Sequence, residues 1–253
     1  MKSLTAPWLH RTETHRILWC FLILSLAGST RAEFVASVYG GVTFHQNGDL
    51  RLQQNDGTDL TFHDVGYKSQ NFNSPPYYGA RLAYFLGDRA RLGFGIEFFH
   101  AKIYLDNRAS AQVTGRRGGV QVNGSELIRN TIEDFSNSHG LNFLTADVIY
   151  RWFLAEPGQG FLSRLQPYAG AGAGVLIPHV EATIGGVRQE NYQITGPGAQ
   201  VFGGISFDLA KHLFVFSEYK FSYARLNGED VPGGRITADA FTHHLVLGMG
   251  LKF

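Results

Sequence analysis

The final nine residues of the chain alternate between two kinds of side chain. Leu245, Leu247, Met249, Leu251 and Phe253 occupy every second position, and mostly small or polar residues stand between them. Because successive side chains of a β-strand point to opposite faces, this pattern predicts a strand with one apolar face. The rest of the sequence indicates whether that apolar face contacts a protein core or a lipid bilayer.

The first 32 residues have the composition of a secretory signal peptide. Basic residues precede an apolar run at 17–27, and small residues lead to Ala32. The run is too short to cross a bilayer as a helix, so we expect cleavage after Ala32 and a mature domain at 33–253. Cys20 leaves a lipoprotein signal as the alternative, although the bulky Trp19 before it argues against lipidation. Cys20 is the only cysteine, so the mature chain has no disulfide.

The composition restricts the partners and the route across a membrane. The formal net charge is +1, which gives no basic footprint for a nucleic acid, and we expect no nucleic-acid partner. The chain has 31 glycines and 13% aromatic residues. A chain of this kind, without a long apolar segment, can still cross a membrane as a closed barrel.

Segments of alternating polarity recur along the mature domain. They predict an all-β fold, an eight-stranded antiparallel transmembrane β-barrel of the outer membrane, expected to be monomeric. An even strand number places both ends in the periplasm and the longer loops outside the cell, so we predict that the polar stretches Gln46–Pro76 and Asp106–Gly140 are extracellular loops. We also expect the barrel assembly machinery to recognise the last strand. The predicted strands are 34–45, 77–86, a strand from 92, 141–153, 168–182, 192–207, 213–223 and the C-terminal segment.

Six charged residues fall on the inward faces of these strands and balance by sign. A narrow barrel must fill its interior, and buried ions need partners, so we favour a structural ionic network. Glycines that alternate with alanines in 168–182 would leave room for these side chains. The predicted network consists of Arg81, Arg151, Lys220, Glu97, Asp147 and Glu218.

In two of the predicted strands, the alternation of apolar and polar residues is interrupted near the outer end of the strand. A bulge near Phe99 would turn His100 and Lys102 inward, and Pro178 precedes His179 and Glu181 in a similar way. We therefore predict that these four polar residues gather at the outer rim as catalytic residues.

Two chemistries suit the four rim residues. His100, His179 and Glu181 could bind a metal ion, and the same groups could serve in general acid–base catalysis. A polar rim that only meets water and lipid phosphates is the alternative, because such short motifs are weak signals.

Short segments spread over the mature chain resemble one known family. They are 74–79, 99–104, 140–145, 178–181, 192–197 and 218–220, which read SPPYYG, FHAKIY, GLNFLT, PHVE, YQITGP and EYK. In this order they resemble segments of the rhizobial lipid A oxidases. The resemblance implies an outer-membrane enzyme that oxidises the proximal glucosamine of lipid A to an aminogluconate. Such an enzyme uses oxygen and releases peroxide.

The resemblance also suggests partners and a cofactor. Lipid A occupies the outer leaflet, so its sugars would lie level with the rim residues, and cationic side chains could hold its phosphates. The chain has no flavin or nicotinamide motif, and we therefore suspect a divalent transition metal. The alternative is a non-enzymatic small barrel with structural or adhesive loops.

Overall fold

The computed structural model describes residues 32–87 and 89–253, and the predicted signal peptide lies outside the described residues except for Ala32. No helix in this part of the chain is long and apolar enough to cross a membrane. The elements are β1 (Glu33–His45), β2 (Gly48–Gln54), β3 (Asp59–Val65), β4 (Tyr67–Lys68), β5 (Tyr78–Phe85), β6 (Leu92–Leu105), β7 (Ser110–Arg117), β8 (Val120–Leu127), η1 (Ile128–Asn130), β9 (Asp134–Arg151), η2 (Phe161–Arg164), β10 (Leu165–Ile184), β11 (Val187–Tyr192), β12 (Pro197–Asp208), β13 (Leu213–Val231) and β14 (Gly234–Lys252).

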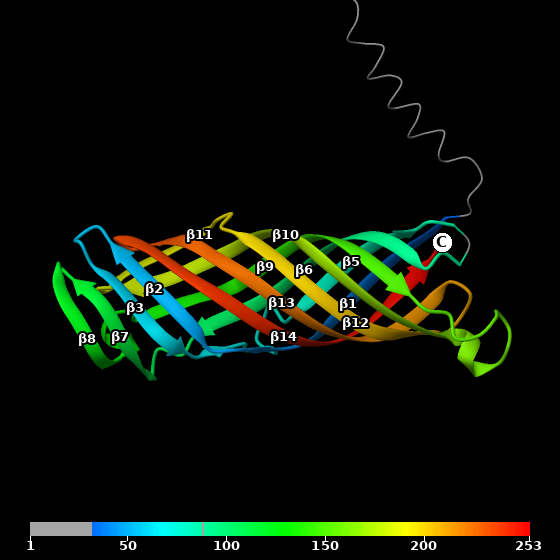
Figure 1. Cartoon of the computed structure of the whole chain (residues 1–253), viewed down its shortest axis with the longest axis horizontal. Coiled ribbons are helices and arrows are strands. Elements are labelled where there is room, and N and C mark those ends of the chain that lie inside the picture. Colours follow the sequence, from blue (N-terminus) through cyan, green and yellow to red (C-terminus); the bar gives the residue numbers. More distant parts are fainter. Residues whose placement is uncertain (1–31, 88) are drawn as a thin grey trace, which may run out of the picture.

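Eight of these strands form a closed antiparallel ring. They follow one another in the order β1, β5, β6, β9, β10, β12, β13 and β14, and β14 pairs again with β1. Backbone hydrogen bonds between Phe34 and Phe253, 3.1 and 2.9 Å long, hold the two ends of the ring together. The C-terminus lies at the end of the barrel opposite β7 and β8 (Figure 1). Because Phe34 is bonded to Phe253, the start of β1 lies at the same end. The predicted eight-stranded barrel is confirmed.

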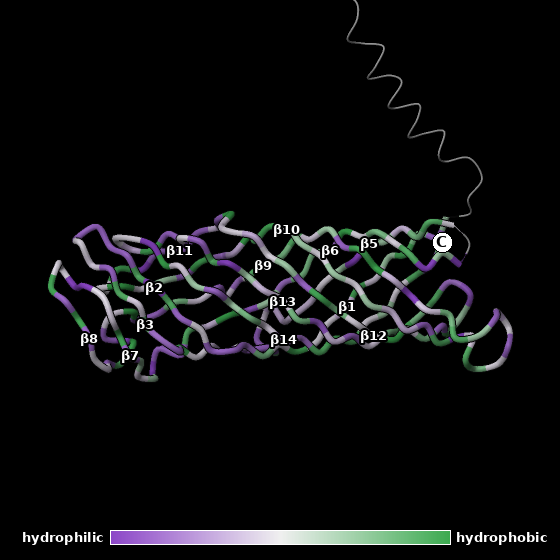
Figure 2. Tube along the Cα trace, viewed as in Figure 1, coloured by the Kyte–Doolittle hydropathy of each residue, from purple (hydrophilic) through white to green (hydrophobic). Residues whose placement is uncertain are grey.

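Over the half near the chain ends, the wall of this ring is apolar outside, and its lumen contains both ion pairs and buried apolar side chains. Leu247 is 70% exposed, whereas the neighbouring Val246 is 2% exposed. Figure 2 shows hydrophobic and hydrophilic residues following one another along the strands of the ring. A continuous apolar exterior is stable when lipid surrounds it and when ring closure satisfies every backbone group. This half is therefore a transmembrane β-barrel.

Glycines on β10 make room for the contents of the lumen, as the sequence predicts. A Cβ atom on Gly172 would collide with the carboxylate of Asp147, and one on Gly170 would collide with the ring of Phe202. The alternating alanines Ala171 and Ala173 lie on the exposed outer face. The small lumenal residues of β10 thus allow large side chains from its neighbours to cross the interior.

The segments Gln46–Pro76 and Asp106–Gly140 are not the irregular loops that we predicted. They contain β2, β3, β4, β7 and β8, and the order β14–β2–β3–β7–β8 continues the barrel wall beyond the membrane. We call this part the extension. Its polarity is reversed, because water rather than lipid surrounds it and drives apolar side chains inward. Fully buried side chains of its core include Leu50, Leu52, Leu60, Phe62 and Val113.

Strand limits also differ from the prediction. β9 starts at Asp134 and β13 runs on to Val231, because both continue into the extension. The predicted strand 192–207 is divided, since β11 ends at Tyr192 and β12 begins only at Pro197. Proline cannot donate a ladder hydrogen bond, which suits the first position of a strand.

A buried carboxyl group in the extension makes the stability dependent on pH. Glu229 is completely buried, and burial raises its pKa from an ordinary value near 4.5 to about 8. The folded chain therefore holds a proton that the unfolded chain releases. This contribution is fully present below about pH 4.5 and is lost as pH rises through about 8. The slope is about 1.4 kcal/mol per pH unit.

Glu229→Gln is the corresponding test. Wild-type protein in micelles is expected to unfold at a lower urea concentration at pH 8 than at pH 6. The amide side chain of the variant cannot ionise, so the variant should lose most of this difference. An equal pH dependence in both proteins would contradict the assignment.

Candidate functional site

An irregularity of β9 shapes the outer wall just above the apolar belt. Ala101 of β6 pairs with Leu141 and Ile103 pairs with Asn137, so three residues of β9, 138–140, lie opposite the single residue Lys102 of β6. An irregularity of register also appears in the pairing of β9 with β10. Gly140 takes the left-handed backbone conformation, with φ +117°, that favours glycine. The bulge therefore belongs to β9, between its two neighbours.

This position corrects our prediction that a bulge near Phe99 turns His100 and Lys102 inward. Phe99, Ala101 and Ile103 belong to the buried core, so His100 and Lys102, which alternate with them, face outward. The ring of His100 stacks on that of the exposed Tyr78, with centroids 5.0 Å apart. β6 keeps its alternation because the extra residues lie in the neighbouring strand.

His179 and Glu181 also face outward. Val180 and Ala182, which alternate with them on β10, lie in the core. The ring of His179 contacts that of the exposed Tyr192, at 4.5 Å between centroids. The residues predicted to turn inward at the outer rim thus stand on the outer wall of the barrel.

The β9 bulge adds a third residue to this pair. His139 Nδ1 lies 2.8 Å and His179 Nδ1 3.5 Å from the same oxygen of Glu181, Oε1. The two imidazole rings are 4.9 Å apart. One ligand atom from each of the three residues lies within 4.8 Å of the others. We call His139, His179 and Glu181 the outer-wall cluster.

Two observations bear on what the outer-wall cluster can hold. The buried Nδ1 of His179 has no hydrogen-bond partner among the described residues, so this nitrogen is available as a metal ligand. Glu181, in contrast, already accepts hydrogen bonds from Ser138 and from Arg188, whose Nη2 lies 3.1 Å from Oε2. Two imidazoles and a carboxylate are nevertheless a donor set of open metal sites. The residues fit a divalent transition metal if the ion replaces these contacts.

Sequence reasoning missed His139. The segment before residue 141 was predicted to be a loop, so His139 had no expected strand partner. The available signal was Gly140, because a glycine beside an alternating strand often marks a bulge.

His100 and Lys102 lie on the other side of β9 from His179. His100 Nδ1 is 2.9 Å from Asn142 Oδ1, and its Nε2 has no partner among the described residues. Lys102 Nζ donates to the carbonyl oxygens of Asn73 and Ser74, at 3.3 and 3.0 Å. In the part of the chain that the structure describes, the ligand group therefore contains His139 in the place where we predicted His100.

The lumen contains a separate set of buried ion pairs. Arg81 bridges Glu97, at 3.0 Å, and Glu218, at 2.8 Å. Lys220 lies 2.6 Å from Glu97, and all four side chains are at most 7% exposed. The amide of Gln200 donates to Glu97. This set closes the middle of the barrel.

The two other predicted members of the network are placed differently. Asp147 joins through Gln200, whose Nε2 lies 2.8 Å from Asp147 Oδ1. Arg151 is not in contact with this set. It pairs with Glu33 at 2.6 Å near the end of the barrel, and its guanidinium lies over the ring of Phe85.

The closed ring, the apolar belt and the ion-filled lumen define the chain as an eight-stranded transmembrane β-barrel.

No family model matches the chain, and neither does any curated protein. Several solved structures of outer-membrane barrels are similar to it. Neisserial surface protein A is 15% identical, with a TM-score of 0.41, covering 88% of this chain and 97% of that chain. A major outer membrane protein from Thermus thermophilus is 13% identical, with a TM-score of 0.42 and coverage of 88% and 99%. The N-terminal barrel domain of Pseudomonas aeruginosa OprF is 14% identical, with a TM-score of 0.39 and coverage of 88% and 98%.

Proposed function

We propose that the protein is an outer-membrane enzyme that oxidises the proximal glucosamine of lipid A to an aminogluconate. One observation carries the proposal. His139, His179 and Glu181 offer three metal-binding atoms within 4.8 Å of one another on the outer wall. They lie next to the upper end of the apolar belt, where the headgroups of the outer leaflet would be found. The resemblance to lipid A oxidases agrees with this position.

The overall reaction moves two electrons and two protons from the sugar to oxygen. The anomeric carbon loses its hydrogen and its hydroxyl proton to give a lactone, and oxygen becomes hydrogen peroxide. Water then opens the lactone to the acid. A divalent transition metal at the cluster would supply the redox chemistry. Whichever of the His139 and His179 imidazoles is not coordinated to the metal would accept the hydroxyl proton.

Cationic side chains beside the cluster would hold a phosphate of the lipid. Arg188 has a side chain that is 64% exposed and already lies beside Glu181. Guanidinium groups bind phosphate oxygens through paired hydrogen bonds. Lys102 is buried against the carbonyl oxygens of Asn73 and Ser74, so we assign it to holding the segment before β5 rather than to phosphate.

The proposal includes the route to the membrane. The barrel assembly machinery would receive β14, whose outward face carries Leu245 to Leu251 at every second position, with Phe253 directly after the strand. The ring closes within one chain through β1 and β14, so a monomer is a sufficient unit.

Mass spectrometry of lipid A tests the function. Cells that produce the protein should contain lipid A one oxygen heavier than lipid A of cells without it. Purified protein should bind one divalent transition metal ion, and a chelator should abolish the mass gain. Lipid A of unchanged mass, with oxygen supplied, would contradict the enzymatic proposal.

A non-enzymatic barrel is the alternative, and one observation favours it. Glu181 is already paired with His139 and Arg188, so the cluster could be an ion-pair group that only holds the bulge. Metal analysis separates the two, because a structural ion-pair group would bind no metal ion.

A further inference from the structure

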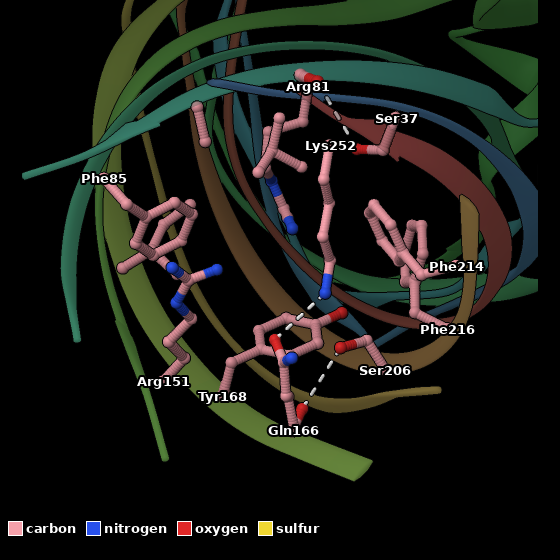
Figure 3. A pocket seen from close by; sticks show the side chains of 13 residues that line it. Ser37, Arg81, Phe85, Arg151, Gln166, Tyr168, Ser206, Phe214, Phe216 and Lys252 are labelled. Atoms are coloured by element: carbon pink, nitrogen blue, oxygen red, sulfur yellow. Dashed lines mark hydrogen bonds between the residues drawn. The ribbon is translucent and has the colours of Figure 1, made fainter. Parts of the chain in front are cut away.

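The lumen contains a cavity (Figure 3). It lies in the half of the barrel that carries the chain ends, because Val35 and Lys252 line it. The empty space between its walls measures about 520 Å³, including its opening to solvent, and it is lined by all strands of the ring except β6. The cavity is separate from the outer-wall cluster, because its lining side chains point into the lumen.

Most of the cavity wall is apolar. Phe85 and Ile149 lie on one side, and Phe214 and Phe216 come from β13. Each of the four is buried to at least nine-tenths. A transmembrane lumen can be filled with polar side chains, as it is around the ion pairs above. This part instead offers a hydrocarbon surface, and apolar pockets with a few polar groups are the usual form of small-molecule sites.

The charged groups on the cavity wall are all cationic. Arg81, Arg151 and Lys252 line it, and none of its lining residues is an aspartate or glutamate. Arg81 and Lys252 extend into the space (Figure 3). Lys252 Nζ also donates to Asp208 and Gln166, at 2.5 and 3.2 Å, which leaves the third N–H of its ammonium for the cavity. The carboxylate partners of these cations, Glu97, Glu218, Glu33 and Asp208, lie outside the lining, so the N–H donors that remain on the wall suit an anionic acceptor.

A second donor on this wall is unused. Arg81 is 6% exposed, and its Nε–H has no hydrogen-bond partner among the described residues. Its other nitrogens bind Glu97 and Glu218. An unmade hydrogen bond of a buried charged group is costly, so an acceptor oxygen at this point would be favourable.

We propose that the cavity binds an anionic amphiphile, a carboxylate on a short hydrocarbon chain. The carboxylate accepts hydrogen bonds from Arg81 Nε and Lys252 Nζ, and the chain packs against the phenylalanine rings. The chain must be short, because the ion pairs of Glu97 and Glu218 close the lumen beyond Arg81.

Equilibrium dialysis of radiolabelled octanoate against the barrel in zwitterionic lipid nanodiscs tests this proposal, with empty nanodiscs as background. Saturable binding of one octanoate per barrel is expected, and unlabelled octylammonium should not compete. Lys252→Met should weaken binding about tenfold or more, since it removes a charge-assisted hydrogen bond. Lys211→Met, which changes an exposed lysine in a turn, is the matched control and should bind as wild type does.

A second pair of variants tests the cavity itself. Ser206→Leu and Ala83→Leu each place extra carbon atoms into the space and should abolish binding, while a heat-modifiable gel shift verifies the folded barrel. The proposal is overturned if wild-type protein shows no saturable binding. Equal affinities of the two lysine variants, or full binding by a folded leucine variant, would also overturn it.

Discussion

Glu181→Gln is expected to lower the rate of lipid A oxidation by at least about 10²-fold while the barrel stays folded. The carboxylate is the one anionic ligand of the outer-wall cluster, and His139 and His179 both contact it. His179→Ala should have a similar effect, because the free Nδ1 of that ring is lost. The measurement is the one-oxygen mass gain of lipid A over time, with the metal content of each purified protein.

Two controls separate catalysis from support of the bulge. Arg188→Gln removes the ion pair with Glu181 but leaves the three ligands, so metal binding should persist. His63→Ala removes a histidine of the extension that pairs with Asp49 and should leave activity unchanged. Full activity in both Glu181→Gln and His179→Ala would remove this cluster from consideration.

Glu97→Gln is expected to destabilise the barrel by about 3–5 kcal/mol, because Arg81 and Lys220 are left in the lumen without their shared carboxylate. Both cations are almost inaccessible to water. The measurement is the urea concentration at which half of the protein in micelles unfolds, followed by tryptophan fluorescence and by the gel shift.

The matched control for Glu97 is Asp59→Asn. Asp59 forms an exposed ion pair with Arg51, 2.6 Å long, with side chains 42% and 51% exposed. Exposed pairs contribute about 0.2–1 kcal/mol, so this variant should unfold close to wild type. Equal shifts for Glu97→Gln and Asp59→Asn would show that the lumenal ion pairs do not hold the barrel together.

The ring and its polarity could be predicted from the sequence. The period of two is a covalent property of an extended chain, so the alternation around Leu247 shows which side chains share a face. Inward charges such as Arg81 and Glu97 could be named for the same reason. Arg151 follows the same alternation but lies nearer the end of the barrel, where Glu33 is its partner. The alternation of side chains along a strand specifies which face of the strand a residue lies on. It does not specify which residues lie at the same height along the barrel axis.

The membership and the direction of the outer-wall cluster were determined by the tertiary structure and not by the sequence pattern. His179 and Glu181 were identified from the sequence, but their direction depended on which of three paired strands carries the bulge. The extra residues lie in β9, and they bring His139 to Glu181 across a sequence separation that no local pattern reports.

The extension shows the same division between sequence and tertiary structure. Leu50 and Leu52 alternate with polar residues, and Met249 and Leu251 alternate with small or polar ones, yet the first pair is buried and the second faces outward. Alternation establishes that an apolar face exists. Whether that face turns toward the interior or toward lipid depends on whether water or lipid surrounds that part of the strand. The surrounding medium is known only once the height of each strand along the barrel is known.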